Sequence, residues 1–166
     1  RVSVRYANGE MLDFTRKDVD SDPAHAASAD FGQALLARDL NRDGYTDLVV
    51  SDPGTEFGLT LFVLYGGPKG LDPANPVSVS TQVSPGAGRV LAYLNGDKPL
   101  LVAGGAGDSV LAWSIGADGR PAGDPTAMSP ETLGLPASAP GSQFGTSLAA
   151  SGTVLVLGAP GETVNN

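Results

Sequence analysis

The sequence lacks cysteine altogether and has a single histidine, His25. Without thiols the chain forms neither disulfides nor thiolate metal sites, and cysteine usage therefore gives no indication of the redox compartment. A lone histidine in an expected loop is more typical of a solvated surface residue than of a catalytic base, and no Gly-x-Ser-x-Gly motif lies beside it. These absences argue against a hydrolase triad.

Basic residues are scarce, and long apolar runs are missing. Lys and Arg total 10 against 18 Asp and Glu, which gives a formal net charge of -8. Phosphate contacts need clustered basic side chains, so we expect no nucleic-acid partner. The longest apolar runs, residues 59–65 and 99–103, are much shorter than the roughly 20 residues of a spanning helix. We therefore also expect no membrane span.

Glycine and proline, in contrast, are plentiful, at 23 and 13 residues. Interruptions at this density leave little room for helices of ordinary length, whereas short strands joined by turns accommodate them. The composition therefore predicts an all-β fold. Residues 33–40 are the main competing signal, because their Ala and Leu favour a helix. We assign them to a strand because they belong to a repeat.

The repeat is marked by three glycines, each followed by a short apolar strand, a turn and a second apolar strand. Phe31-Gly32 opens the first copy, Gly88 the second and Phe144-Gly145 the third. The spacing is 56 residues from 32 to 88 and 57 residues from 88 to 145. This period suits a four-stranded β-propeller blade with generous loops.

The chain then divides into about three blades' worth of strands, as part of a larger propeller. Residues 1–19 supply outer strands, 30–83 a blade, 87–135 a degenerate blade, and 141–166 inner strands. Asn8-Gly9, Asn95-Gly96 and Ser151-Gly152 are each predicted to form a two-residue hairpin turn, since glycine tolerates positive φ.

One of the repeated turns is replaced by a loop rich in oxygen ligands. Asp39, Asn41, Asp43 and Asp47 occupy loop positions 1, 3, 5 and 9, with a glycine at position 6 and the Tyr45 carbonyl at position 7. Calcium binds six to eight hard oxygen ligands, and alternate residues of a tightly curled loop converge on one centre. The loop predicts a calcium site.

Three other interpretations of this loop fit the sequence less well. An EF-hand needs a bidentate Glu at position 12, where Val50 stands, and it needs flanking helices. A dockerin-like loop also needs a helix where this chain has a strand pattern. A solvated turn without metal is possible for Asp, Asn and Gly. We favour calcium, because four convergent oxygen side chains repel one another without a cation, and we expect the ion to be structural.

Together, Phe31-Gly32, the loop at residues 39–47 and the closing Ser51-Asp52-Pro53 resemble the FG-GAP repeat of integrin α-subunit propellers, and Gly158-Ala159-Pro160 matches the name. The resemblance implies calcium loops and a secreted or cell-surface module for adhesion or protein binding. It differs where Ser51-Asp52 stands for the family's Gly-Ala. An integrin-like propeller has seven blades, so we expect another chain, a second copy or a missing segment to complete this one.

Two functions remain open. The first is a non-catalytic module that binds a protein or glycan ligand through its loops. The second is the accessory propeller portion of a secreted phospholipase- or esterase-like hydrolase, whose catalytic part lies elsewhere. Two weaker enzymatic signals read as structural: the glycine-rich residues 66–70 lack Walker spacing and suit a turn, and Asp18, Asp20 and Asp22 suit a solvated acidic loop.

Overall fold

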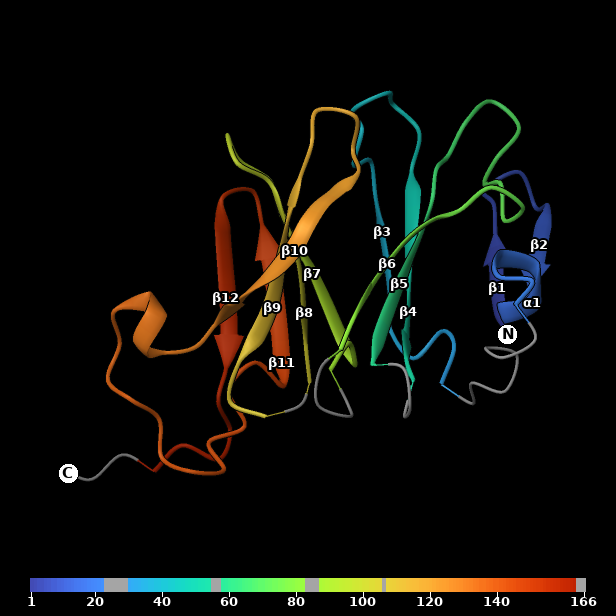
Figure 1. Cartoon of the computed structure of the whole chain (residues 1–166). Helices are drawn as coiled ribbons and strands as arrows, with labels where there is room; N and C mark the ends of the chain where they lie inside the picture. Colours follow the sequence, from blue (N-terminus) through green and yellow to red (C-terminus); the bar gives the residue numbers. More distant parts are fainter. Residues whose placement is uncertain (23–29, 55–57, 83–86, 106, 164–166) are drawn as a thin grey trace.

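A computed structural model describes residues 1–22, 30–54, 58–82, 87–105 and 107–163. Within these ranges the strands form four antiparallel sheets that follow one another along the chain and stand side by side in Figure 1. The strands are β1 (Val2–Arg5), β2 (Met11–Phe14), β3 (Leu35–Arg38), β4 (Asp47–Pro53), β5 (Leu59–Leu64), β6 (Val77–Thr81), β7 (Val90–Leu94), β8 (Leu100–Gly104), β9 (Val110–Ile115), β10 (Pro121–Met128), β11 (Ser147–Ser151) and β12 (Val154–Gly158).

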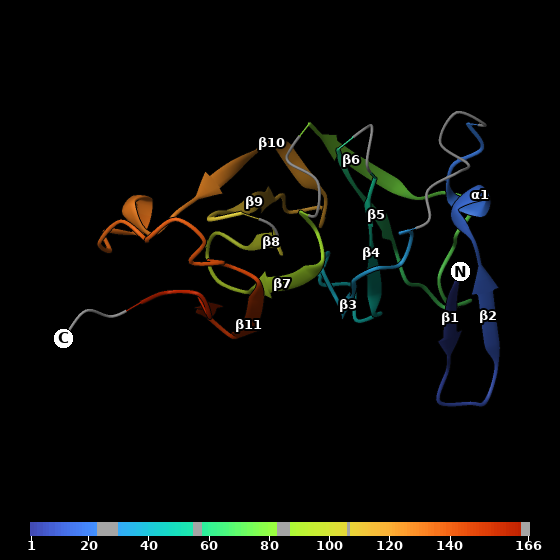
Figure 2. The same ribbon diagram turned by 90° about the horizontal axis from the view of Figure 1, so that it is seen from below.

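Two of the sheets are complete four-stranded meanders, ordered β3-β4-β5-β6 and β7-β8-β9-β10. The first strands of successive sheets contact one another, β3 with β7 and β7 with β11, and the last strands β6 and β10 also meet. Figure 2, seen from below, shows these first strands on one side and the last strands on the other. Sequential antiparallel sheets packed in this way are propeller blades. The all-β fold class is therefore confirmed.

The glycine that opens each repeat marks the same structural position in all three copies. Gly32, Gly88 and Gly145 have φ of 85°, 86° and 78°, in the left-handed region that favours glycine. Each donates its N–H to a carbonyl in the last part of the second strand of its own copy, on Ser51, Gly104 and Gly158 respectively, at 2.8–2.9 Å. The repeat seen in the sequence is thus a repeat of backbone geometry.

The same glycines also bring neighbouring blades into contact. A Cβ on Gly32 would lie 3.0 Å from Val2 Cγ2, and on Gly88 it would clash more severely with Leu59. Val2 and Leu59 are the first residues of β1 and β5. A Cβ on Gly145 would likewise meet Val110, the first residue of β9. Each repeat glycine therefore packs on the preceding sheet, and β1 takes the place held by β5 and β9.

The core lies between blades rather than inside one. Side chains alternate along a strand, and on β5 both sets are buried. Leu59, Leu61 and Val63 pack toward the β7–β10 sheet. Phe62 and Leu64 pack toward the β1–β2 hairpin. A central strand buried on both faces needs a neighbour on each side, so the blades stabilise one another.

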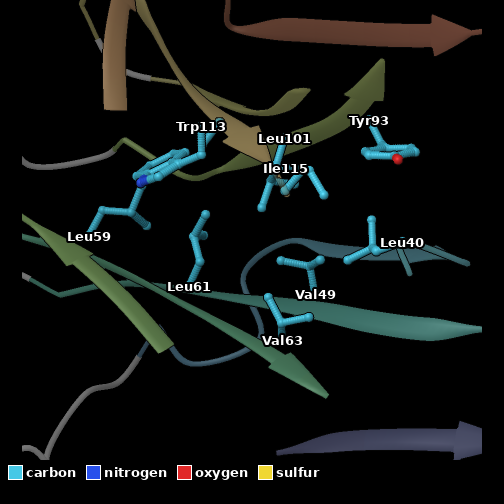
Figure 3. Close-up of a cluster of buried hydrophobic side chains, with 10 residues drawn as sticks. Leu40, Val49, Leu59, Leu61, Val63, Tyr93, Leu101, Trp113 and Ile115 are labelled. Carbon is cyan, nitrogen blue, oxygen red and sulfur yellow. The ribbon is translucent and has the colours of Figure 1, made fainter. Parts of the chain in front are cut away.

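Figure 3 shows the cluster between the two complete blades. Trp113 and Leu101 of one blade face Leu59 and Leu61 of the other, and all four side chains are at most 1% exposed. Burying a side chain of this size contributes roughly 1.5–3 kcal/mol to stability. A third cluster joins β7–β10 to the β11–β12 hairpin.

A short helix that the sequence analysis did not predict, α1 (Arg16–Val19), joins the first hairpin to the first blade. Arg16 is buried at 8% exposure and forms ion pairs with Asp52 of β4 and, at 2.9 Å, with Asp20. Its guanidinium lies 4.9 Å from the centroid of the Phe62 ring. Among the described residues, no helix is long and apolar enough to cross a membrane.

Residues 33–40 have a helical preference, but β3 forms within them and pairs with β4, as the repeat predicts. Another element was missed. The Pro/Gly-rich stretch after β9 forms β10, which pairs with β9 through a register shift between Ala122 and Thr126. The strand lies at the outer edge of its sheet, where a proline costs no ladder hydrogen bond.

The predicted two-residue turn at Asn8-Gly9 is wrong. Tyr6 donates its N–H to the Glu10 carbonyl at 2.9 Å, and Gly9 donates to the Tyr6 carbonyl at 3.0 Å. The loop therefore has three residues, with Gly9 at φ 91°. A turn followed by a left-handed residue is the next most common hairpin connection after the two-residue types.

The two later turns also differ from the prediction. Leu94 pairs with Leu100, so residues 95–99 form the loop, and Asn95 instead donates its N–H to the Gly152 carbonyl of the next hairpin at 2.9 Å. In the third copy Ser151 pairs with Val154, which places the two-residue turn one position later than predicted. Contacts between hairpins, rather than local propensity, set the first of these loops.

The inter-blade role of the repeat glycine can be tested with Gly88→Ala. This change combines positive φ with a clash against Leu59, and it should lower the free energy of unfolding by about 2–5 kcal/mol. Gly107→Ala is the matched control, because Gly107 has φ 78° but nothing within 4 Å of an added Cβ, so only about 1–2 kcal/mol should be lost. Urea denaturation measures both. Equal losses would contradict the proposed packing.

Candidate metal-binding loop

The predicted calcium loop connects β3 to β4 and lies at the upper end of the first complete blade in Figure 1. Eight residues, 39–46, separate the two strands, and Asp47 is the first residue of β4. The loop is curled by two left-handed residues, Arg42 at φ 62° and Gly44 at φ 89°. These two residues bend the backbone within the loop.

Hydrogen bonds from the loop's own backbone hold its first three polar side chains. Asp39 accepts from the N–H of Asp43 at 3.2 Å and from the N–H of Gly44 at 2.9 Å, one on each carboxylate oxygen. Asn41 Oδ1 accepts from Asp43 N–H at 3.1 Å, and its Nδ2 donates to Asp43 Oδ2 at 2.9 Å. Asp43 Oδ1 in turn accepts from Tyr45 N–H at 2.8 Å. Bonds within the loop thus orient the side-chain oxygen atoms of Asp39, Asn41 and Asp43.

Asp47 differs from these residues because it is fully buried. Its Oδ2 accepts from Leu40 N–H at 2.7 Å and its Oδ1 from Gly66 N–H at 2.8 Å. Burial raises the pKa of the Asp47 carboxyl, these backbone donors lower it, and the nearby charge of Asp43 adds to the increase. Asp47 therefore connects the loop to the segment that follows β5.

The loop is wedged between two blades. A Cβ on Gly119, in the β9–β10 turn of the next blade, would lie 2.6 Å from Asn41, so the two backbones are in close contact. The Tyr65 hydroxyl donates to the Gly119 carbonyl at 3.0 Å, and burial raises the pKa of Tyr65 to about 12. Arg42 donates a hydrogen bond to Asn95 Oδ1, which also belongs to the next blade, at 3.3 Å. Ordering this loop therefore also orders a blade interface.

The donor set suits calcium, since it consists of carboxylate, amide and carbonyl oxygens only. A carboxylate offers about four lone-pair sites, so the two hydrogen bonds to Asp39 leave capacity for a cation. Among the described residues, however, no three acidic or histidine side chains come together as a metal cluster. Calcium binding by Asp39, Asn41, Asp43, Asp47 and the Tyr45 carbonyl stays a prediction.

The other residues considered as functional have structural partners or lie outside the description. Asp18 accepts from the N–H and hydroxyl of Thr15 at 2.7 and 2.8 Å, which lowers its pKa and caps α1. Asp20 accepts from Arg16 and from the N–H of Asp22. His25 lies outside the described residues. The sequence analysis missed Gly66, whose N–H binds Asp47 from 19 residues away.

The two roles assigned to acidic residues of the loop can be separated in calcium-free buffer. Asp47→Ala leaves one buried and one part-buried N–H group without their acceptor and should cost roughly 2–5 kcal/mol of unfolding free energy, whereas exposed Asp43→Ala should cost below about 1 kcal/mol. Chemical denaturation in EGTA measures the difference. If Asp47→Ala proves as harmless as Asp43→Ala, its structural role is refuted.

Comparison with known families agrees with this geometry. Residues 31–58 match the family model of the FG-GAP repeat, a span that covers the opening Phe31-Gly32, the calcium-type loop and all of β4. A comparison with curated proteins finds no significant match to the chain. The chain therefore carries an FG-GAP repeat at residues 31–58, built into the first complete blade of a β-propeller-type fold.

Proposed function

We propose that this chain is a calcium-stabilised, non-catalytic binding module that acts outside the cytoplasm. The observation that carries the proposal is the loop at residues 39–47, an all-oxygen donor set within an FG-GAP repeat, in which backbone N–H groups of the loop itself hold Asp39 and Asp43. The repeat of this chain resembles the FG-GAP repeat of integrin α-subunit propellers. This resemblance supports a role in adhesion to a protein or glycan ligand. Another chain or copy would complete the propeller.

The calcium ion would act as a structural element rather than a reactive one. Asp39, Asn41, Asp43, Asp47 and the Tyr45 carbonyl would hold it, and the loop they form contacts the next blade at Gly119. The ion would neutralise three carboxylates that otherwise repel one another. By ordering the loop, it would stabilise the packing of two blades and leave the connections at both ends of the sheets free for binding.

The proposed location of the protein follows from where enough calcium is available to fill the site. Extracellular-type sites bind with dissociation constants of roughly 0.1–1 mM, so they are occupied outside cells and nearly empty in the cytosol. The net charge of -8 adds to the expected effect, since a bound cation reduces the self-repulsion of an acidic chain. A secreted or surface-exposed module would therefore gain its full stability only at its site of action.

Thermal unfolding with and without calcium tests the proposal. At about 10 mM calcium the stabilisation should be roughly 1.5–3 kcal/mol, which raises the melting temperature by several degrees. Asp43→Ala should abolish most of the shift. Asp97→Ala is the matched control, because Asp97 is an exposed acid in the corresponding β7–β8 loop, and it should keep the shift. A wild-type melting temperature that EGTA leaves unchanged would refute calcium binding.

A further inference from the structure

A groove of about 560 Å³ lies beside the calcium-type loop and belongs to none of the roles discussed so far. Three segments distant in sequence form it: the β1–β2 turn, the end of the loop at residues 45–46, and residues 66–71 after β5. Figure 1 shows these segments at the same end of the sheets. Its volume falls within the roughly 300–1,000 Å³ typical of small-molecule sites.

The walls of the groove are held in place by specific contacts. The Tyr6 hydroxyl accepts from Leu71 N–H at 3.0 Å, which joins the β1–β2 turn to the segment after β5. Gly66 is anchored through its N–H to Asp47. A Cβ on Gly70 would lie 2.7 Å from the Tyr6 hydroxyl, so glycine permits the close approach of these two segments. The groove is therefore built by the packing of three loops.

The side chains that line the groove combine flat apolar surface with hydrogen-bonding groups. Tyr6 and Tyr45 contribute aromatic rings, and Tyr45 is 42% exposed. Asn8 donates to Glu10 at 2.8 Å, which fixes an amide and a carboxylate side by side. Aromatic rings and amide groups with exposed faces supply both the apolar and the polar contacts of a small-molecule site.

The charges of the residues that line the groove are balanced. Among the groove residues, Glu10 carries the one negative charge and Lys69 the one positive charge, so the lining is neutral although the whole chain is strongly acidic. A neutral lining gives no electrostatic preference for an anion or a cation. A neutral ligand with apolar faces and many hydroxyl groups matches both the rings and the polar groups.

We propose that this groove binds a neutral saccharide. The proposal rests on the binding function proposed above and specifies its ligand class and its site. Tyr45 and Asp47 would link the two features, because Tyr45 lines the groove while its carbonyl belongs to the calcium-type loop, and Asp47 anchors Gly66 at the groove wall.

The test is a titration followed by ¹⁵N–¹H NMR in calcium-containing buffer. The probes are glucose, galactose, mannose and N-acetylglucosamine, with glucuronic acid and glucosamine as charged comparisons. At least one neutral sugar should shift the Gly66, Gly67 and Gly70 amide signals saturably at millimolar concentration, and more strongly than either charged sugar. Tyr45→Ala and Asn8→Ala should each weaken binding at least about tenfold, the effect of losing roughly 1.4 kcal/mol of contact.

Val156→Ala is the control variant, because Val156 is an apolar side chain 58% exposed on β12 at the other end of the molecule, and it should bind as the wild type does. The proposal is overturned if no neutral sugar shifts these amides, if the charged sugars act equally well, or if the shifts map elsewhere. The calcium melting shift measured on the same samples separates the two proposals: calcium stabilisation without sugar binding overturns only the saccharide site, and sugar binding without calcium stabilisation overturns only the calcium role.

Discussion

The structure depends on contact between blades, because its central strands are buried on both faces. On β5, one set of alternating side chains packs on the following blade and the other on the preceding hairpin. Backbones must therefore approach closely where a blade begins. Gly32, Gly88 and Gly145 provide this approach, each with positive φ, and they lie against the first residues of β1, β5 and β9 respectively. The Phe-Gly element of the repeat is thus explained by packing.

Once blade contact is fixed by these glycines, the connections at the sheet ends can vary. The link between the first two strands has eight residues in the first complete blade, five in the second and two in the β11–β12 hairpin. The longest of these links carries the calcium-type donors and lies against the next blade at Gly119. Loop length therefore varies on a constant frame, and the proposed calcium site and the proposed ligand groove both involve the longest of these links.

The sequence predicted the blades well because their signal is periodic. The spacing of the three glycines outweighed the helical propensity of residues 33–40, and β3 forms there. Local rules failed where tertiary contacts decide. Asn95 bonds to the neighbouring hairpin, so its turn lengthens. β10 contains two prolines, Pro121 and Pro125, which are tolerated because the strand lies at an edge. The helix α1 had a weak signal, the capping pair Thr15 and Asp18.

The site was predictable as a set of donors but not as an environment. Loop spacing indicated Asp39, Asn41, Asp43, Tyr45 and Asp47, yet no local pattern reveals that Asp47 is fully buried or that Gly66 is its partner. Tertiary contacts also explain why Ser51-Asp52 stands where the family has Gly-Ala. Ser51 Oγ accepts from the Ala34 N–H at 2.9 Å, and Asp52 forms an ion pair with buried Arg16. At that position Asp52 therefore serves the contact with α1, while Ser51 binds the backbone just before β3.

The most direct measurement of the central claim is an anomalous difference map from a crystal grown with calcium. The account predicts one peak inside the loop at residues 39–47, surrounded by oxygen atoms of the five named residues at roughly 2.3–2.6 Å. The account is contradicted if, in millimolar calcium, the loop keeps its internal hydrogen bonds and its centre holds only water or nothing.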